Sequence, residues 1–346
     1  KMERHRGEDR LFLDEQTQRA LELTETVRGG DRKGTLLWAL DRTESSMGAR
    51  LLREWVTLPL RSVEGIRDRH TAVGELIGSW EKVQKRIRPI CDLERVCAKV
   101  GAGRANARDL TALRETLTQL PELRALEFTA PLLQSLPIGE HRELRLYLEK
   151  ALAEEPPAPL TEGGLIREGF DEELDQIRSL ATDGKGWIAR FESDEIERTG
   201  IPSLRVGYTH VFGYYIEVTH THKAKIPENY IRKQTLKNAE RYITPELKEV
   251  ESKVLNAQER SKKLEYNIFQ RVRDRVAEDL TSLQETGNGV ARLDVIASLS
   301  RVAEEKNYLF YLGLSIYLII HVGTAAELHL ERNIPWEPDD HYHYII

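Results

Sequence analysis

The sequence predicts a mainly α-helical protein, with a helical core, long lever-like helices and a small α+β domain inserted between them. Apolar residues recur every three to four positions over most of the chain, which is the period of an amphipathic helix. Between residues 204 and 221 the period changes to two, as in a β-strand. Beyond Pro245 there is no proline until Pro335, and an apolar helical stripe continues for about forty residues.

Length and composition favour several folded units in one soluble chain. The 346 residues exceed the usual size of one domain, so two or more units are expected. A hydrophobic content of 40% with 31% charged residues excludes a disordered chain. The segment Lys1 to Arg10 is too polar for a signal peptide, and the apolar run at 309–322 is shorter than the roughly 20 residues that span a bilayer. We therefore expect a cytoplasmic protein with no membrane partner and with two reduced cysteines.

Short packed helices are predicted in the first half of the chain. Their apolar stripes begin at Leu36 and recur at helical spacing as far as residue 117. Thr35 and Ser45 are expected to cap two helices, because a side-chain oxygen there accepts hydrogen bonds from free N–H groups of the first turn. Helices are expected to stop or start at three prolines, Pro59, Pro89 and Pro121.

An outgoing arm and a hairpin are predicted next. Residues 154–164 contain three prolines and two glycines and should form a loop. Helical spacing returns from Asp171 to about Arg198, although Gly184 and Gly186 predict a break within it. Residues 204–221 then predict a β-hairpin, which needs a third strand or flanking helices because an isolated hairpin is marginally stable.

Three histidines fall on this predicted hairpin, at His210, His220 and His222. Their even spacing places them on one face of a strand. A transition-metal site and an ordinary surface or phosphate-facing position are both compatible with this spacing, and we favour the second.

The returning segment predicts one long helix. Its apolar stripe from Leu247 to Leu283 corresponds to roughly 60 Å at 1.5 Å per residue. Asn288 lies between two glycines and is expected to end or bend the helix, after which the pattern resumes from Arg292 to Lys306. The expected organisation is a helical body, an outgoing arm, a small tip and a long returning helix.

Positive charge is concentrated at this predicted tip. The whole chain has a formal charge of −6, whereas residues 205–241 contain seven Lys or Arg against three Asp or Glu, a local net charge of +4. The same stretch supplies hydroxyl and amide donors that can bind phosphate oxygens without reading bases. A solvated charged surface beside a hairpin is an equally good interpretation of these residues alone.

Several stretches of the sequence resemble the bacterial MutS family of DNA mismatch repair proteins. VFGYYIEV at 211–218 and YIRKQTLKNAERYITPELKE at 230–249 resemble that family's clamp domain. LELTETVRGGDRKGTLLWALD at 21–41 and MGARLLREWVTLP at 47–59 resemble the start of its core and lever domain. Shorter matches fall in the family's order, at 92–96, 119–123 and 169–174, so the resemblance covers about residues 8 to 308.

The resemblance implies a clamp that closes over duplex DNA and touches its backbone without regard to sequence. Thr209, Lys233 and Asn238 match positions at which the family's clamp contacts phosphates. We extend this expectation to neighbouring donors, so that the expected DNA-binding residues are Thr209, Arg232, Lys233, Gln234, Thr235, Lys237 and Asn238. Partners implied by the resemblance are double-stranded DNA, a second MutS protomer and a MutL-type protein.

Catalysis and mismatch reading are not expected within this segment. The family's mismatch-reading and ATPase domains have no match here. The string nearest to a GxxxxGK[ST] phosphate loop, TDGKGW at 182–187, lacks the leading glycine and the final Ser or Thr. No GxSxG or HExxH motif occurs either. We therefore expect no enzyme activity, cofactor or metal in this chain, with ATP and Mg held by the family's ATPase domain.

We expect four parts along the chain. Residues 1–184 should form the first part of the core and lever domain, 185–254 the clamp, 255–308 the returning lever helix and core, and 309–346 a tail of unknown role. For the tail, an altered reading frame and an added docking segment are both open interpretations. The alternative function is a long-armed helical structural or protein-interaction module without DNA binding, and a salt titration of DNA affinity would separate the two.

Overall fold

The computed structural model describes residues 10–306 except residues 158 and 210, so the predicted tail at 309–346 lies outside the described residues. It is mainly α-helical with one small antiparallel sheet, as predicted. None of the described helices is both long and apolar enough to cross a membrane. In chain order the elements are α1 (Glu15–Ala20), α2 (Leu36–Leu40), α3 (Ser46–Thr57), α4 (Val63–Leu76), α5 (Trp80–Ile87), α6 (Leu93–Gly101), α7 (Ala107–Arg124), α8 (Pro131–Gln134), α9 (Arg142–Ala151), α10 (Glu172–Thr199), β1 (Arg205–Thr209), β2 (Gly213–Thr219), η1 (His220–Lys225), β3 (Ile231–Thr235), β4 (Ala239–Ile243), α11 (Pro245–Glu278) and α12 (Leu280–Glu305).

The chain divides into two compact units. Unit 1 takes its described residues from Lys1–Gly101, Ala112–Arg142 and Glu278–Ile346, and unit 2 from Ala102–Thr111 and Glu143–Ala277. The four-part division of the chain stays a prediction.

Unit 1 is built around α12. This helix packs against α3, α4, α5 and α6 and buries residues on every side. The expected break at Asn288 is wrong, because α12 continues through it. A Cβ at Gly287 would lie 3.3 Å from Leu93 Cβ, and one at Gly289 would lie 2.9 Å from Ile138 Cγ1. The two glycines therefore allow neighbouring segments to approach closely and do not end the helix.

A buried carboxylate joins α12 to the start of α3. Asp294 is fully buried and accepts hydrogen bonds from the backbone N–H groups of Glu44 and Ser45 and from Ser45 Oγ. Burial raises the pKa of Asp294 above its ordinary value. Ser45 Oγ accepts in turn from Gly48 N, and Thr35 Oγ1 accepts from Trp38 N, so both predicted caps are confirmed.

The prolines have mixed roles in this part of the chain. α3 ends two residues before Pro59 and α5 ends two residues before Pro89, as expected. α7 instead runs through Pro121 to Arg124, which corrects the third expectation.

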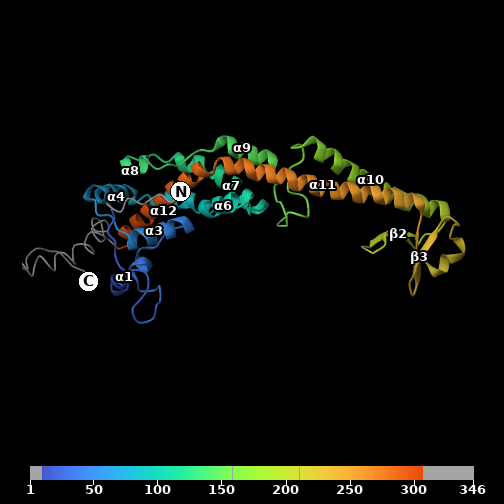
Figure 1. The fold of residues 1–346 in the computed structure, drawn as a ribbon, viewed down its shortest axis with the longest axis horizontal. Coiled ribbons are helices and arrows are strands. Elements are labelled where there is room, and N and C mark those ends of the chain that lie inside the picture. The colour runs from blue at the N-terminus through green and yellow to red at the C-terminus, as the bar shows by residue number, and fades with distance from the viewer. Residues whose placement is uncertain (1–9, 158, 210, 307–346) are drawn as a thin grey trace, which may run out of the picture. The chain divides into compact units, whose positions relative to one another are not determined.

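Unit 2 contains the long helix pair α10 and α11, which lie side by side (Figure 1). The predicted break in α10 is wrong, because the helix continues through Gly184 and Gly186. A Cβ at Gly184 would lie 2.2 Å from Val254 Cγ2, so this glycine lets α10 approach α11 closely. At 1.5 Å per residue the 34 residues of α11 span about 51 Å. The predicted single helix is therefore two, since α11 ends at Glu278 and Asp279 precedes α12.

The sheet has the strand order β1-β2-β4-β3, with every neighbouring pair antiparallel. The predicted hairpin is confirmed as β1 and β2, whereas β3 and β4 were not predicted as strands. One face of the sheet packs on the adjoining ends of α10 and α11. The buried residues of that shared core are Ile188, Phe191, Ile201, Leu204, Ile216, Val218, Tyr230, Tyr242, Leu247 and Val254. The strands therefore obtain the support that an isolated hairpin lacks.

Candidate nucleic-acid interface

On the outer face of the sheet, opposite the shared core, Arg241 of β4 contacts side chains of both neighbouring strands. Its guanidinium lies 4.2 Å above the ring of Tyr215 and donates to Glu217 Oε2 at 3.0 Å. It also donates to Gln234 Oε1 at 3.0 Å. Arg241 is therefore neutralised and stacked, which gives it a structural role on β4.

On the core face, the carboxylate of Glu240 lies close to two positively charged side chains near β3, Lys223 and Arg232. It is 3% exposed and accepts from Tyr242 Oη and, at 3.0 Å, from Lys223 Nζ. Arg232 Nη1 lies 3.7 Å from the same carboxylate. The hydrogen bond from Tyr242, and then that from Lys223, hold the pKa of Glu240 below its usual value. Burial and the Glu240 carboxylate raise the pKa of Tyr242 to about 12.

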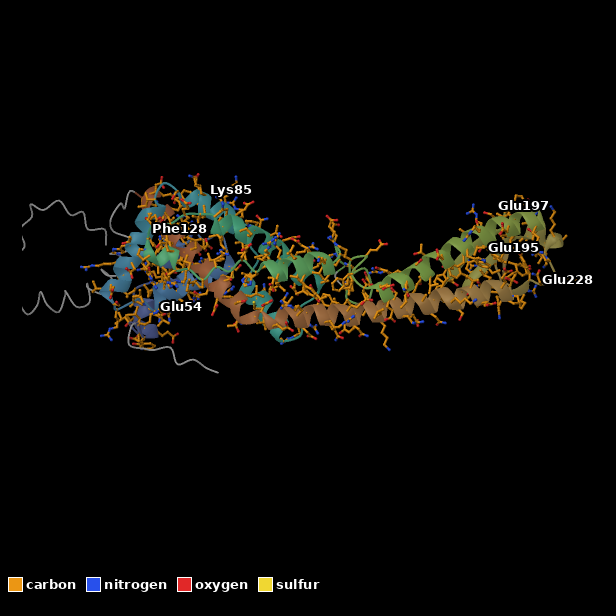
Figure 2. The ribbon with its side chains drawn as sticks, turned by 90° about the horizontal axis from the view of Figure 1, so that it is seen from above. Glu54, Lys85, Phe128, Glu195, Glu197 and Glu228 are labelled. Atoms are coloured by element: carbon orange, nitrogen blue, oxygen red, sulfur yellow. The ribbon has the colours of Figure 1, made fainter. Side chains whose placement is uncertain are left out.

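Two further carboxylates join the sheet to the helices. Glu195, at the sheet end of α10 (Figure 2), accepts from Tyr230 Oη at 2.5 Å and from Arg198. Burial, together with Glu195, raises the pKa of Tyr230. On α11, Glu251 accepts from Tyr214 N at 3.1 Å, close to the start of β2. The orientation of the sheet on its helices is thus fixed by buried polar contacts as well as by the apolar core.

A second group of polar residues on β3 and the following turn has no such partners. Lys233, Thr235, Lys237 and Asn238 are exposed, and no residue in the described part of the chain accepts a hydrogen bond or forms an ion pair with either lysine. Lys233 sits at a register shift, where the β3–β4 pairing passes from Arg232 directly to Gln234. These residues form a solvent-facing edge of two ammonium groups with a hydroxyl and an amide. We call them the β3 edge.

The predicted DNA-binding residues are only partly brought together. Arg232 and Gln234 adjoin the β3 edge, but their side chains contact Glu240 and Arg241. Thr209 ends β1, the opposite edge strand, and its Oγ1 accepts from Phe212 N at 3.3 Å. Thr209 pairs with the first residue of β2, whereas Asn238 adjoins the partner of its last residue. Gly213 and Thr219 are six residues apart on β2, and each residue of a strand advances it by about 3.4 Å. Thr209 and Asn238 therefore lie near opposite ends of the sheet, about 20 Å apart.

His220 and His222 do not lie on a strand face, which corrects that expectation for these two residues. His220 and His222 belong to η1, and His210 lies outside the described residues. His220 supports the turn of the β3 edge, because its backbone N donates to Asn238 O at 3.2 Å and its Nε2 lies 3.0 Å from Leu236 O. Sequence reasoning missed this role, since nothing in the pattern indicates a contact across sixteen residues.

Comparisons with known proteins agree with this arrangement. The family model described as MutS domain III matches residues 16–300. The chain is 46% identical to the DNA mismatch repair protein MutS of Acetivibrio thermocellus, over 88% of this chain and 36% of that protein. It is 48% identical to the MutS of Symbiobacterium thermophilum, over 87% and 35% of the respective chains. For the MutS of Methanothrix thermoacetophila the identity is 45%, over 93% and 38%.

A mainly helical fold with a small sheet, in a sequence that matches mismatch repair proteins over most of its length, places the chain in the class of DNA mismatch repair proteins. The chain belongs to the MutS family. It spans about a third of the length of the curated relatives it matches.

Proposed function

We propose that this chain is the lever and clamp portion of a MutS-type protein and that its sheet grips duplex DNA through the phosphate backbone. One observation carries the proposal: the two lysines of the β3 edge have no partner among the residues that the structure describes, while neighbouring cations are neutralised within the sheet. An exposed ammonium group can take a phosphate without first breaking an ion pair. The hydroxyl of Thr235 and the amide of Asn238 add neutral donors for phosphate oxygens.

The proposed contact carries no base-reading element. The tyrosine rings of the hairpin pack within the sheet. Tyr215 lies under Arg241, Tyr214 packs on the shared core, and Tyr208, although 44% exposed, packs on Tyr214. We therefore propose binding that depends on charge and is indifferent to sequence. The wider activity of the family, including mismatch recognition, ATP and Mg binding, a second protomer and a MutL-type partner, belongs to the same proposal, with catalysis outside this segment. A cytoplasmic, nucleoid-associated location is also part of this proposal.

The test is a salt titration of duplex binding by the full chain, followed by fluorescence anisotropy. Each phosphate neutralised by a cation contributes about 0.9 to the slope of log affinity against log salt. Replacing both Lys233 and Lys237 by glutamate should reduce the slope by about 1.8 and weaken binding to all duplex sequences alike.

A double variant on α5 is the matched control. Lys82 and Lys85 are exposed and three residues apart, and Lys85 is labelled in Figure 2. Converting both to glutamate changes the net charge by the same amount and should leave the slope nearly unchanged. Equal losses in the two double variants would refute a local contact at the β3 edge. Absence of duplex binding at low salt would favour the alternative of a protein-interaction module.

A further inference from the structure

A second site of positive charge lies in unit 1 and uses none of the sheet residues. A pocket of about 410 Å³ is lined by residues of α3, α4 and α12 and of the segments around them. This volume is within the range of small-molecule sites in proteins. Its apolar wall includes Trp55, Leu60 and Leu132, and Asn288 of α12 contributes an amide.

Three arginines line this pocket, and their positive charges are incompletely matched. Arg10 donates to Leu58 O at 2.8 Å and pairs with Glu54 Oε1 at 3.3 Å, and Glu54 is labelled in Figure 2. For Arg69 and Arg292, no acceptor within hydrogen-bond or ion-pair distance is found among residues 10–306, leaving aside 158 and 210. Asp68 also lines the pocket, but its side chain is exposed and bonds to neither of them.

Stacking on an aromatic ring holds the Arg69 side chain in place, and the carboxylate of Glu54 attracts it without a direct ion pair. Its guanidinium carbon lies 3.3 Å from the centre of the Trp55 ring, and Trp55 is 2% exposed. Burial, and then repulsion from Arg10 and Arg292, lower the pKa of Arg69 to about 9. Burial also lowers the pKa of Arg292. The fold thus holds two partly buried cations that line one cavity, an arrangement that an entering anion would stabilise.

We propose that this pocket binds a small phosphate-type oxyanion between the guanidinium groups of Arg69 and Arg292. Planar guanidinium groups present paired N–H donors that match the oxygens of a phosphate. Trp55 stacks on the Arg69 guanidinium and holds its orientation, and Asn288 adds an uncharged donor to the lining. The pocket shares no residue with the β3 edge, so this proposal can be tested independently of the proposed DNA contact.

The experiment measures the thermal midpoint of the full chain in inorganic phosphate, in pyrophosphate and in chloride of equal ionic strength. An anion that binds the folded state raises the midpoint as its concentration grows. Either phosphate should raise it above the chloride value, and calorimetric titration should give a dissociation constant at least tenfold weaker for Arg69→Gln and for Arg292→Gln. A larger effect of pyrophosphate would identify a site for two phosphoryl groups, and a larger effect of inorganic phosphate a site for one.

Arg67→Gln is the matched control, because Arg67 is exposed on the same helix α4 and does not line the pocket. It should bind the anion as the unchanged chain does, as should the Lys233→Glu, Lys237→Glu double variant. The proposal is overturned if neither phosphate exceeds chloride, if Arg69→Gln and Arg67→Gln respond equally, or if the lysine variant loses the response.

Discussion

Replacing Glu265 tests whether one buried carboxylate holds unit 2 together along its helix pair. Glu265 of α11 is 2% exposed. Its Oε1 accepts from the backbone N–H groups of Leu165 and Ile166 and from Arg178 of α10 at 2.8 Å, while Oε2 accepts from Gly164 N at 3.0 Å. One side chain therefore joins α11 to a loop and to the neighbouring helix.

The cost of Glu265→Ala follows from the donors it leaves unpaired. Leu165 and Ile166 are buried, so their N–H groups cannot turn to water. At about 1–3 kcal/mol for each unsatisfied buried donor, the two together cost about 2–6 kcal/mol. That is a large fraction of the roughly 5–15 kcal/mol by which most proteins are stable. Glu265→Gln should cost less, because the amide keeps one oxygen acceptor.

Amide hydrogen exchange is the most direct assay. The N–H groups of residues 164–166 should lose protection in Glu265→Ala, and urea denaturation should show the lowered stability of the chain. Glu259→Ala is the control, since Glu259 is exposed on the same helix. Unchanged protection at residues 164–166, or a destabilisation no larger than that of Glu259→Ala, would refute the reasoning.

Two further predictions concern packing and pH. In α10, Gly184→Ala should destabilise the chain by about 1–3 kcal/mol, because the new methyl group meets Val254. An added methyl group at Gly186 has nothing within 4 Å, so Gly186→Ala should stabilise the chain by up to about 1 kcal/mol. Urea denaturation measures both effects, and equal effects of the two variants would contradict close packing at Gly184. In unit 1, His141 Nε2 lies 2.7 Å from Thr286 Oγ1, and burial lowers the pKa of His141 below 6.5. The stability that this neutral ring contributes is present above pH 6.5 and is lost as the pH falls through the lowered pKa of His141. Between pH 7.5 and pH 5 the unchanged chain should therefore lose more unfolding free energy than the His141→Asn variant. Equal losses in the two proteins would contradict this prediction.

The regular helices and the first hairpin could be predicted because each buries one face. Ser45, for example, combines a capping side chain with an apolar stripe directly after it. β3 could not be predicted in this way. It is an edge strand whose residues from Ile231 to Lys233 are all exposed, so no apolar alternation marks it.

The glycines misled sequence reasoning for a related reason. Glycine lowers helix propensity, and from the sequence alone Gly184 and Gly287 indicate breaks. In the structure both lie where another segment comes close: an added methyl group would clash with Val254 at Gly184 and would be tightly packed against Leu93 at Gly287. A close approach involves residues distant along the chain, so the local pattern holds no signal for it. The partners of Glu265, about a hundred residues away, escaped prediction for the same reason.

The net charge of residues 205–241 likewise could not show which lysines and arginines form ion pairs and which do not. The register shift in β3 explains why Arg241 is neutralised and Lys233 is not. With regular pairing after Arg232 and Tyr242, Lys233 would stand opposite Arg241, and two like charges at directly opposed positions destabilise a sheet. The extra residue instead brings Gln234 opposite Arg241, where its carbonyl oxygen accepts a hydrogen bond. Lys233 is left outside the ladder and exposed. A single inserted position thus removes a repulsion that would weaken the sheet and leaves the same lysine available to a phosphate.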